Sequence, residues 1–123
     1  MARILIIEDT MENMYLTTYL LTNAGHEIIQ ATTGEEGVKK ALSEHPDIIL
    51  MDILLPGIDG YEATRQIKKA EKESPIPVIA LTSYAMVGDR EKALSLGCSG
   101  YIEKPIDPDT FVKKIEEFLK RGE

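Results

Sequence analysis

Three short segments of the chain are apolar almost throughout: residues 4–7, 48–51 and 78–81. A strand with one face in water alternates apolar and polar residues, whereas a strand in a parallel sheet covered by helices is buried on both faces. The three segments therefore predict central strands of such a sheet. Residues 27–31 and 100–103 mix apolar and polar side chains, which predicts two strands at its edges.

Helical patterns fill the intervals between these strands. Apolar residues at helical spacing mark three of the intervals: Met14, Leu16, Leu20 and Leu21; Val38, Ala41 and Leu42; and Phe111, Val112, Ile115, Phe118 and Leu119. Residues 61–70 and 86–96 predict two more helices, the second ended by Gly97. Residues 33–36 have the spacing of a capping box, and Asp107 followed by Pro108 predicts an N-cap and the first position of the last helix.

Strands and helices thus alternate as five β–α units. This alternation implies right-handed crossovers and an α/β fold. The simplest arrangement is a doubly wound, five-stranded parallel sheet in the order 2-1-3-4-5, with helices on both faces, as in flavodoxin-like folds. Neither a linker nor a low-complexity segment divides the chain, so we expect one domain over residues 1–123.

Composition narrows the class of protein. The chain has a formal net charge of −7 and no clustered stripe of lysine and arginine, so we expect no direct nucleic-acid partner. No apolar run approaches the roughly 20 residues needed to cross a bilayer, and no signal peptide is evident. The single cysteine, Cys98, is expected to be buried and suits a reducing compartment. We therefore expect a cytoplasmic protein with no membrane partner.

Polar residues with useful chemistry follow four of the predicted strands. They are Glu8 and Asp9 after the first strand, Asp52 after the third, Thr82 and Ser83 after the fourth, and Lys104 after the fifth. Open α/β sheets bind ligands outside the carboxyl ends of their strands, near the switch in strand order. One such residue could simply mark a strand entering solvent, but this explains the whole set poorly. The sequence predicts that three carboxylates, a hydroxyl and a lysine meet in one cleft.

Such a cluster has a defined chemistry. Two carboxylates about 4 Å apart repel each other by roughly 4 kcal/mol, and protonation, Lys104 or a divalent cation can relieve this. Carboxylate, carbonyl and water oxygens together suit Mg²⁺. His26 and His45 are expected to be solvated surface residues away from this cleft, which argues against zinc. A carboxylate beside Mg²⁺ can attack phosphorus and form an acyl phosphate, with Lys104 and Thr82 stabilising the phosphoryl oxygens.

Four motifs, taken in order, resemble those of the receiver domains of two-component response regulators. They are Glu8-Asp9, residues 51–60, Leu81-Thr82-Ser83 and residues 101–105, and the resemblance covers the whole chain. It implies that Asp52 is the phosphoacceptor. It also implies that Asp9, Asp52 and the backbone carbonyl of Leu54 ligate Mg²⁺ directly, whereas Glu8 acts largely through water.

The resemblance assigns further roles to the ends of the fourth and fifth strands. Thr82 would hydrogen-bond the phosphoryl group, and Lys104 would pair with a phosphoryl oxygen, or with Asp52 when the site is empty. Tyr101 would be the aromatic switch, turning inward as Thr82 moves toward the phosphate. Without the resemblance, Tyr101 is better described as an edge-strand residue with its hydroxyl in water. The family also implies a cis peptide bond between Lys104 and Pro105.

Two positions that flank the phosphoryl group in this family hold Leu54 and Tyr84. A leucine cannot orient an attacking water, and a tyrosine can shield the site. Hydrolysis needs an aligned water. We therefore hypothesise a long-lived phosphorylated state.

The function implied is a signalling module rather than an enzyme. The chain would accept a phosphoryl group from a histidine kinase or a histidine phosphotransfer protein. Phosphorylation would then shift a pre-existing equilibrium, with the change expressed on the surface of the fourth helix, fifth strand and fifth helix. That surface would bind a downstream protein target or a second copy of the chain.

Two other classes of protein share parts of this pattern. A phosphatase or phosphomutase with an aspartyl phosphate usually needs a second acid two residues after its nucleophile, and Leu54 occupies that place. A flavodoxin needs a phosphate-cradling loop after the first strand, where this chain has Glu8-Asp9-Thr10, whose charges repel phosphate. Turnover of a phosphate monoester would support the first class, and flavin absorbance the second.

Overall fold

The computed structural model describes residues 1–70, 76–82 and 87–121, apart from the side chains of residues 87–90. Ser83 and Tyr84, and residue 86 with which one predicted helix begins, lie outside the described residues. Strands and helices alternate in the order β1 (Arg3–Ile7), α1 (Met11–Asn23), β2 (Glu27–Ala31), α2 (Gly34–Glu44), β3 (Ile48–Asp52), α3 (Gly60–Ala70), β4 (Val78–Thr82), α4 (Val87–Ser95), β5 (Gly100–Glu103) and α5 (Phe111–Arg121).

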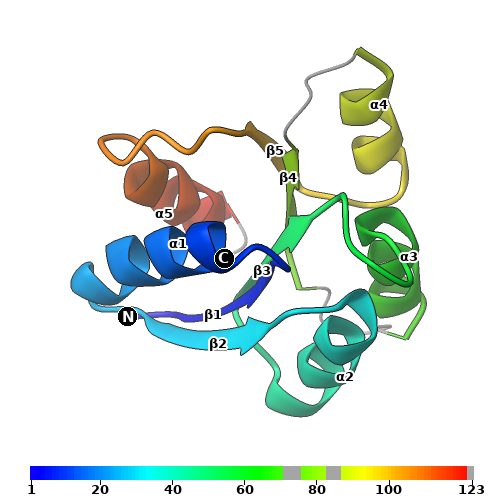
Figure 1. Cartoon of the computed structure of the whole chain (residues 1–123), viewed down its shortest axis with the longest axis horizontal. Helices are drawn as coiled ribbons and strands as arrows, with labels where there is room; N and C mark the ends of the chain where they lie inside the picture. The colour runs from blue at the N-terminus through cyan, green and yellow to red at the C-terminus, as the bar shows by residue number, and fades with distance from the viewer. Residues whose placement is uncertain (71–75, 83–86, 122–123) are drawn as a thin grey trace.

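The strands form one parallel sheet in the order β2-β1-β3-β4-β5, which confirms the predicted α/β fold and strand order (Figure 1). The two strands with mixed sequences, β2 and β5, lie at its edges. Every pair of neighbouring strands is parallel. The carboxyl ends of all these strands therefore lie at the same end of the sheet.

Helices cover both faces of the sheet, with α1 and α5 on one face and α2, α3 and α4 on the other (Figure 1). Side chains alternate between two apolar clusters: Ile4 and Ile6 pack beneath α1 and α5, whereas Leu5 and Ile7 pack beneath the other helices. All four are fully buried. Burial on both faces explains why the central strands are continuously apolar.

Helix α2 approaches the sheet closely because glycine occupies its inner face. A Cβ atom added at Gly37 would lie 2.3 Å from the Cδ1 atom of Ile7. Ala41 is also fully buried, but Leu42 is 39% exposed, so the prediction that Leu42 anchors this helix is wrong. The physical reason is helical geometry, since each residue turns by about 100° and the position after Ala41 faces solvent.

Two predicted helix starts have different outcomes. The Thr33 hydroxyl accepts a hydrogen bond from the Glu36 N–H at 3.1 Å, which confirms the N-cap of α2. The Asp107 carboxylate instead accepts from the Asp109 N–H at 3.0 Å within a turn, and α5 begins only at Phe111. The Asp107 carbonyl also accepts from the Phe111 N–H at 2.9 Å, so Asp107 makes the hydrogen bonds of an N-cap although regular α-helix begins later than predicted. The fixed φ of Pro108 suits a turn as well as the first turn of a helix.

His26 is not a solvated surface residue, contrary to expectation. Its side chain is 7% exposed, its Nδ1 atom accepts a hydrogen bond from the Ala2 N–H at 3.1 Å, and its Nε2 atom lies 3.0 Å from a Glu116 carboxylate oxygen of α5. An imidazole has two ring nitrogens, so it can join a backbone donor to an acidic side chain. His45 is exposed, as expected.

The predictions for Cys98 and Gly97 are confirmed. Cys98 is 6% exposed and its Sγ atom lies 4.0 Å from the Thr64 hydroxyl oxygen. Gly97 follows α4 with a positive φ of 101°, which suits the end of a helix. Within the described ranges, no helix combines the length and apolar character needed to cross a membrane.

Candidate phosphoryl and metal site

Three carboxylates meet at the carboxyl ends of β1 and β3. Glu8 and Asp9 follow β1 directly, and Asp52 is the last residue of β3. Each offers one carboxylate oxygen, and these oxygens all lie within 4.8 Å of one another. Glu8 and Asp52 are only 1% and 4% exposed, whereas Asp9 is exposed. The structure therefore brings together the three acids that the strand ends predicted.

Lys104 reaches this cluster from the end of β5. Its Nζ atom lies 2.7 Å from a Glu8 carboxylate oxygen and 3.3 Å from a carboxylate oxygen of Asp52. Its side chain is 9% exposed, so both ion pairs are shielded from water. The pairing with Asp52 is the one expected for an empty site, but the shorter contact with Glu8 was missed. No local pattern indicates this contact, because Glu8 and Asp9 both lie beyond the end of β1 and Lys104 is distant from them in sequence.

Backbone N–H groups hold the two buried carboxylates in place. The Leu54 N–H donates to one oxygen of Asp52 at 3.1 Å, and the Thr10 N–H donates to one oxygen of Glu8 at 3.2 Å. In each case the donor lies two residues after the acid, in the loop that leaves the strand. The loops therefore fix the orientation of both carboxylates.

The environment of Asp52 favours its neutral form. Burial and the nearby carboxyl group of Glu8 raise the pKa of Asp52 to about 7, although Lys104 and the Leu54 N–H act in the opposite direction. Desolvation penalises the charged form, and a second acid adds repulsion. Without a cation, Asp52 therefore titrates near neutral pH.

Gly60 allows α3 to begin directly against Asp52. A Cβ atom at Gly60 would lie 2.4 Å from the backbone carbonyl oxygen of Asp52 and 2.7 Å from the Cα atom of Ile53. The Gly60 N–H donates to the Ile53 carbonyl at 2.9 Å, which closes the loop between β3 and α3. Asp59 caps α3 by accepting from the Glu62 N–H at 2.9 Å. The close approach at Gly60 was missed, because it depends on contacts that appear only in the folded chain.

Thr82 and Tyr101 lie on the neighbouring strands β4 and β5, near the three carboxylates. Thr82 is 4% exposed at the end of β4, and its carbonyl accepts a hydrogen bond from the Lys104 N–H at 2.7 Å. The ring of Tyr101 packs against the apolar cluster beneath α2, α3 and α4, and its hydroxyl oxygen is buried. Tyr101 therefore lies on an edge strand, as predicted, but the expectation that its hydroxyl lies in water is wrong. The Lys104–Pro105 bond is cis, as the resemblance implies.

The donor set fits a hard divalent cation. Glu8, Asp9 and Asp52 offer only carboxylate oxygens, which Mg²⁺ prefers over the nitrogen and sulfur ligands typical of zinc. A cation bound here would also offset the repulsion between the two buried carboxylates, those of Glu8 and Asp52. The Leu54 side chain, two residues after Asp52 in sequence, is 61% exposed.

Comparison with known proteins gives consistent matches. Residues 4–116 match the family described as response regulator receiver domain. The protein PilH of Pseudomonas aeruginosa is 41% identical over 119 residues, with 97% of this chain and 98% of that protein covered. The polar-differentiation response regulator DivK of Brucella ovis is 42% identical over 116 residues, with 94% of each chain covered.

One solved structure bears on the metal. The receiver domain of a sensor histidine kinase from Pseudomonas aeruginosa PAO1 superposes with a TM-score of 0.88 and 34% identity, covering 97% of this chain and 98% of that one. It has a magnesium ion coordinated in its active site cleft.

Proposed function

The chain belongs to the response regulator receiver domain family, and on that premise we propose that it is a phosphorylation switch with Asp52 as its phosphoacceptor. Receiver domains of response regulators act as signalling modules in two-component systems. The observation that carries the proposal is a buried carboxylate, Asp52, held by a backbone N–H and flanked by two acids and a lysine. We propose that one such domain spans residues 1–123 and that it signals rather than catalyses turnover.

The proposed reaction transfers a phosphoryl group from a phosphorylated histidine. An ionised Asp52 oxygen attacks phosphorus, the new O–P bond forms as the N–P bond breaks, and the imidazole leaves with the electron pair and takes up a proton from water. Lys104 would turn from Asp52 toward a phosphoryl oxygen, and Thr82 would donate its hydroxyl hydrogen to another. Both groups would be in position before the reaction and would stabilise the negative charge on the phosphoryl oxygens. Positioning and charge stabilisation are the main contributions of a protein to phosphoryl transfer.

Mg²⁺ is the cofactor that the donor set fits. Glu8, Asp9, Asp52 and the backbone carbonyl of Leu54 would hold it, with Glu8 acting largely through water. When bound, it would offset the negative charge of the carboxylates and of the incoming phosphoryl oxygens. Relief of this charge would also favour the ionised form of Asp52 that the attack requires.

The proposed output passes through Thr82 at the end of β4 and Tyr101 in β5. A phosphoryl group on Asp52 would draw Thr82 toward it and favour the inward position that Tyr101 has in this structure, which shifts the equilibrium of the surface formed by α4, β5 and α5. The donor would be a histidine kinase or a histidine phosphotransfer protein. A downstream protein or a second copy would read the altered surface, in the cytoplasm and without direct contact to nucleic acid or membrane.

Intact-mass measurement tests the proposed chemistry directly. The protein is incubated with acetyl phosphate, with and without Mg²⁺, and its mass is recorded before the acyl phosphate hydrolyses. We expect a single phosphoryl addition that requires Mg²⁺ and is absent in Asp52→Asn. Asp59→Asn is a matched control, because Asp59 lies in the next loop and its capping role is one that asparagine also fills.

The outcomes separate the alternatives. Addition to wild type and Asp59→Asn, but not to Asp52→Asn, supports the proposal. Addition that persists in Asp52→Asn, or no addition to a folded wild-type protein, contradicts it. Multiple turnover of a phosphate monoester would instead indicate an enzyme.

A further inference from the structure

Helix α4 is anchored to the sheet by a small part of its described surface. Of residues 91–95, whose side chains the structure describes, only Ala93 is buried, and it belongs to the apolar cluster beneath α2, α3 and α4. The other four side chains are exposed. Segments with few buried apolar contacts open locally at a low cost in free energy. One additional contact can therefore change how firmly α4 is held.

Lys92 provides such a contact with α3, its neighbour on the same face of the sheet (Figure 1). The Nζ atom of Lys92 lies 4.3 Å from the centroid of the Tyr61 ring. An ammonium group within about 6 Å of an aromatic face is attracted by the ring, and at an exposed site this changes an equilibrium constant about two- to fivefold. Tyr61 is partly buried against the apolar cluster, so the ring is held in place.

Two further contacts follow the same face of α3. Tyr61, Thr64 and Lys68 are spaced by three and four residues, which places them in one row along the helix. The Thr64 hydroxyl oxygen lies 4.0 Å from the Cys98 Sγ atom. A Cβ atom at Gly97 would lie 3.3 Å from the Lys68 Cγ atom. This row of α3 therefore meets the chain from α4 to the residues before β5.

The contact joins the helices that follow two strands of the phosphoryl site. Tyr61 comes directly after Gly60, which lies against the Asp52 carbonyl at the end of β3. Lys92 belongs to α4, the helix after β4, and β4 ends at Thr82. A movement of Thr82 toward a phosphoryl group on Asp52 would displace the end of β4 relative to that of β3. It would therefore also change the position of α4 relative to α3.

We propose that Lys92 and Tyr61 form a latch that holds α4 against α3 while the phosphoryl site is empty. The latch rests on the proposed function, in which α4 belongs to the surface that changes on phosphorylation. Since the attraction acts within about 6 Å of the ring centroid, a displacement of about 2 Å ends it. The latch thus opposes the change at α4. By linkage, its removal should strengthen binding of a phosphoryl mimic by the same factor by which it loosens α4.

Amide hydrogen exchange, followed by NMR, tests the latch in the empty protein. The N–H groups of Leu96, Gly97 and Cys98 donate to carbonyls of α4, so their exchange reports the opening of this helix. In Lys92→Met we expect these amides to exchange about two- to fivefold faster, relative to amides of β3 that report global unfolding. Lys92→Arg keeps the cation and should restore the protection. Lys39→Met is the matched control, because it removes an exposed lysine from α2.

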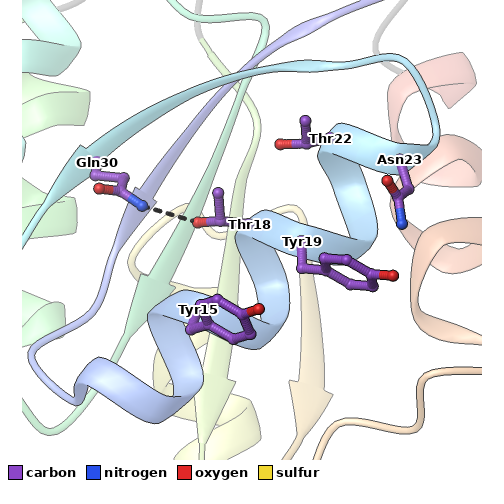
Figure 2. Close-up of a pocket in the computed structure, with 6 residues that line it drawn as sticks. All are labelled: Tyr15, Thr18, Tyr19, Thr22, Asn23 and Gln30. Atoms are coloured by element: carbon purple, nitrogen blue, oxygen red, sulfur yellow. Dashed lines mark hydrogen bonds between the residues drawn. The ribbon is translucent and has the colours of Figure 1, made fainter.

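A double-mutant cycle tests whether the Tyr61 ring is the partner of Lys92. In a Tyr61→Leu protein, Lys92→Met should not accelerate exchange further, because the contact is already lost. Tyr19→Leu is the matched control for the removal of an aromatic ring. Tyr19 lies beside the groove between α1 and β2 that Figure 2 shows, and α1 covers the opposite face of the sheet from α3 and α4. In a Tyr19→Leu protein, Lys92→Met should keep its full effect.

Binding of beryllofluoride in the presence of Mg²⁺ tests the link to the phosphoryl site. We expect its Kd to be about two- to fivefold lower in Lys92→Met than in wild type, and unchanged in Lys92→Arg and Lys39→Met. Exchange at α4 that is unchanged in Lys92→Met overturns the latch, as does an equal Kd in Lys92→Met and wild type. A folded wild-type protein that binds no beryllofluoride contradicts the proposed function and, with it, the role of the latch. The exchange experiment distinguishes this outcome, because α4 would still respond to Lys92→Met.

Discussion

Replacing Asp52 with asparagine is expected to stabilise the metal-free protein, although it removes the residue that we propose as the phosphoacceptor. Asp52 is 4% exposed and shares its site with the buried carboxylate of Glu8. Its ionised form therefore carries the costs of desolvation and of repulsion, which Lys104 offsets only in part. Asparagine has nearly the same shape and can still accept the hydrogen bond from the Leu54 N–H.

The magnitude follows from the pKa of Asp52. Burial and Glu8 raise this pKa from 3.8 to about 7. At about 1.4 kcal/mol per pKa unit, the ionised form destabilises the fold by at most about 4 kcal/mol. A direct Coulomb estimate for two charges about 5 Å apart, at a dielectric constant of about 20, gives about 3 kcal/mol and the same sign. Because asparagine also loses the pairing with Lys104, we expect a gain of about 2–4 kcal/mol at pH 8.

The sign of the pH dependence is opposite to that of a salt-bridged aspartate. An acid whose pKa is raised on folding binds its proton more tightly in the folded state, so stability falls as the pH rises from about 4 to about 7. The Asp52→Asn protein does not lose stability in this way, because asparagine does not ionise. Its advantage over wild type should therefore grow by about 2 kcal/mol between pH 5 and pH 8.

Urea unfolding in EDTA at pH 5 and pH 8 measures these differences, with Asp59→Asn as the control. The control carboxylate is at the surface of the next loop and should show no comparable gain. Saturating Mg²⁺ should reverse the order, because it stabilises a folded wild-type protein that binds it and Asp52→Asn lacks one ligand. An Asp52→Asn protein that is less stable than wild type at pH 8 without metal would refute the reasoning. So would a gain that is equal at both pH values.

Three further predictions concern neighbouring residues. Lys104→Met leaves the Glu8 carboxylate buried without its cation and should lower the free energy of unfolding, measured in urea, by about 3–5 kcal/mol. A Glu8→Gln/Lys104→Met protein that recovers none of this stability would contradict the inference that the loss comes from the unpaired Glu8 carboxylate. Leu54→Asn can orient an attacking water and should shorten the lifetime of the phosphorylated state about tenfold or more, measured by intact mass over time; an unchanged lifetime would show that the leucine does not protect the acyl phosphate. Gly37→Ala should cost about 1–3 kcal/mol in thermal unfolding through its clash with Ile7, and Ile7→Val, which removes the clashing Cδ1 atom, should recover part of that loss.

The sheet and the cluster of acids were predictable because they follow from local pattern and simple geometry. Continuous apolar segments such as residues 48–51 are needed wherever helices cover both faces of a strand. Parallel strands end at a common edge, so the residues after them must converge. It was therefore possible to predict, without any knowledge of side-chain packing, that one cluster would contain Glu8, Asp9, Asp52 and Lys104.

The features that escaped prediction depend on neighbours that are distant in sequence. His26 is buried because Ala2 and Glu116, from the two ends of the chain, both hydrogen-bond to its ring. The closeness of Gly60 to the Asp52 carbonyl depends on how the loop after β3 folds back. Neither contact has a signature in local periodicity.

The position of Lys104 suggests how a change at Asp52 reaches the rest of β5. In the present structure its ammonium group is shared between Glu8 and Asp52, and its backbone N–H is fixed to the Thr82 carbonyl. A phosphoryl group on Asp52 would compete with Glu8 for the ammonium group, because it adds negative charge on the side from which Lys104 approaches. Any shift of Lys104 is then carried by the backbone to Thr82, and by the strand to Tyr101. Glu8 would thus act as the competing partner that sets how far Lys104 moves, so Glu8→Gln should weaken the difference between the empty and phosphorylated states.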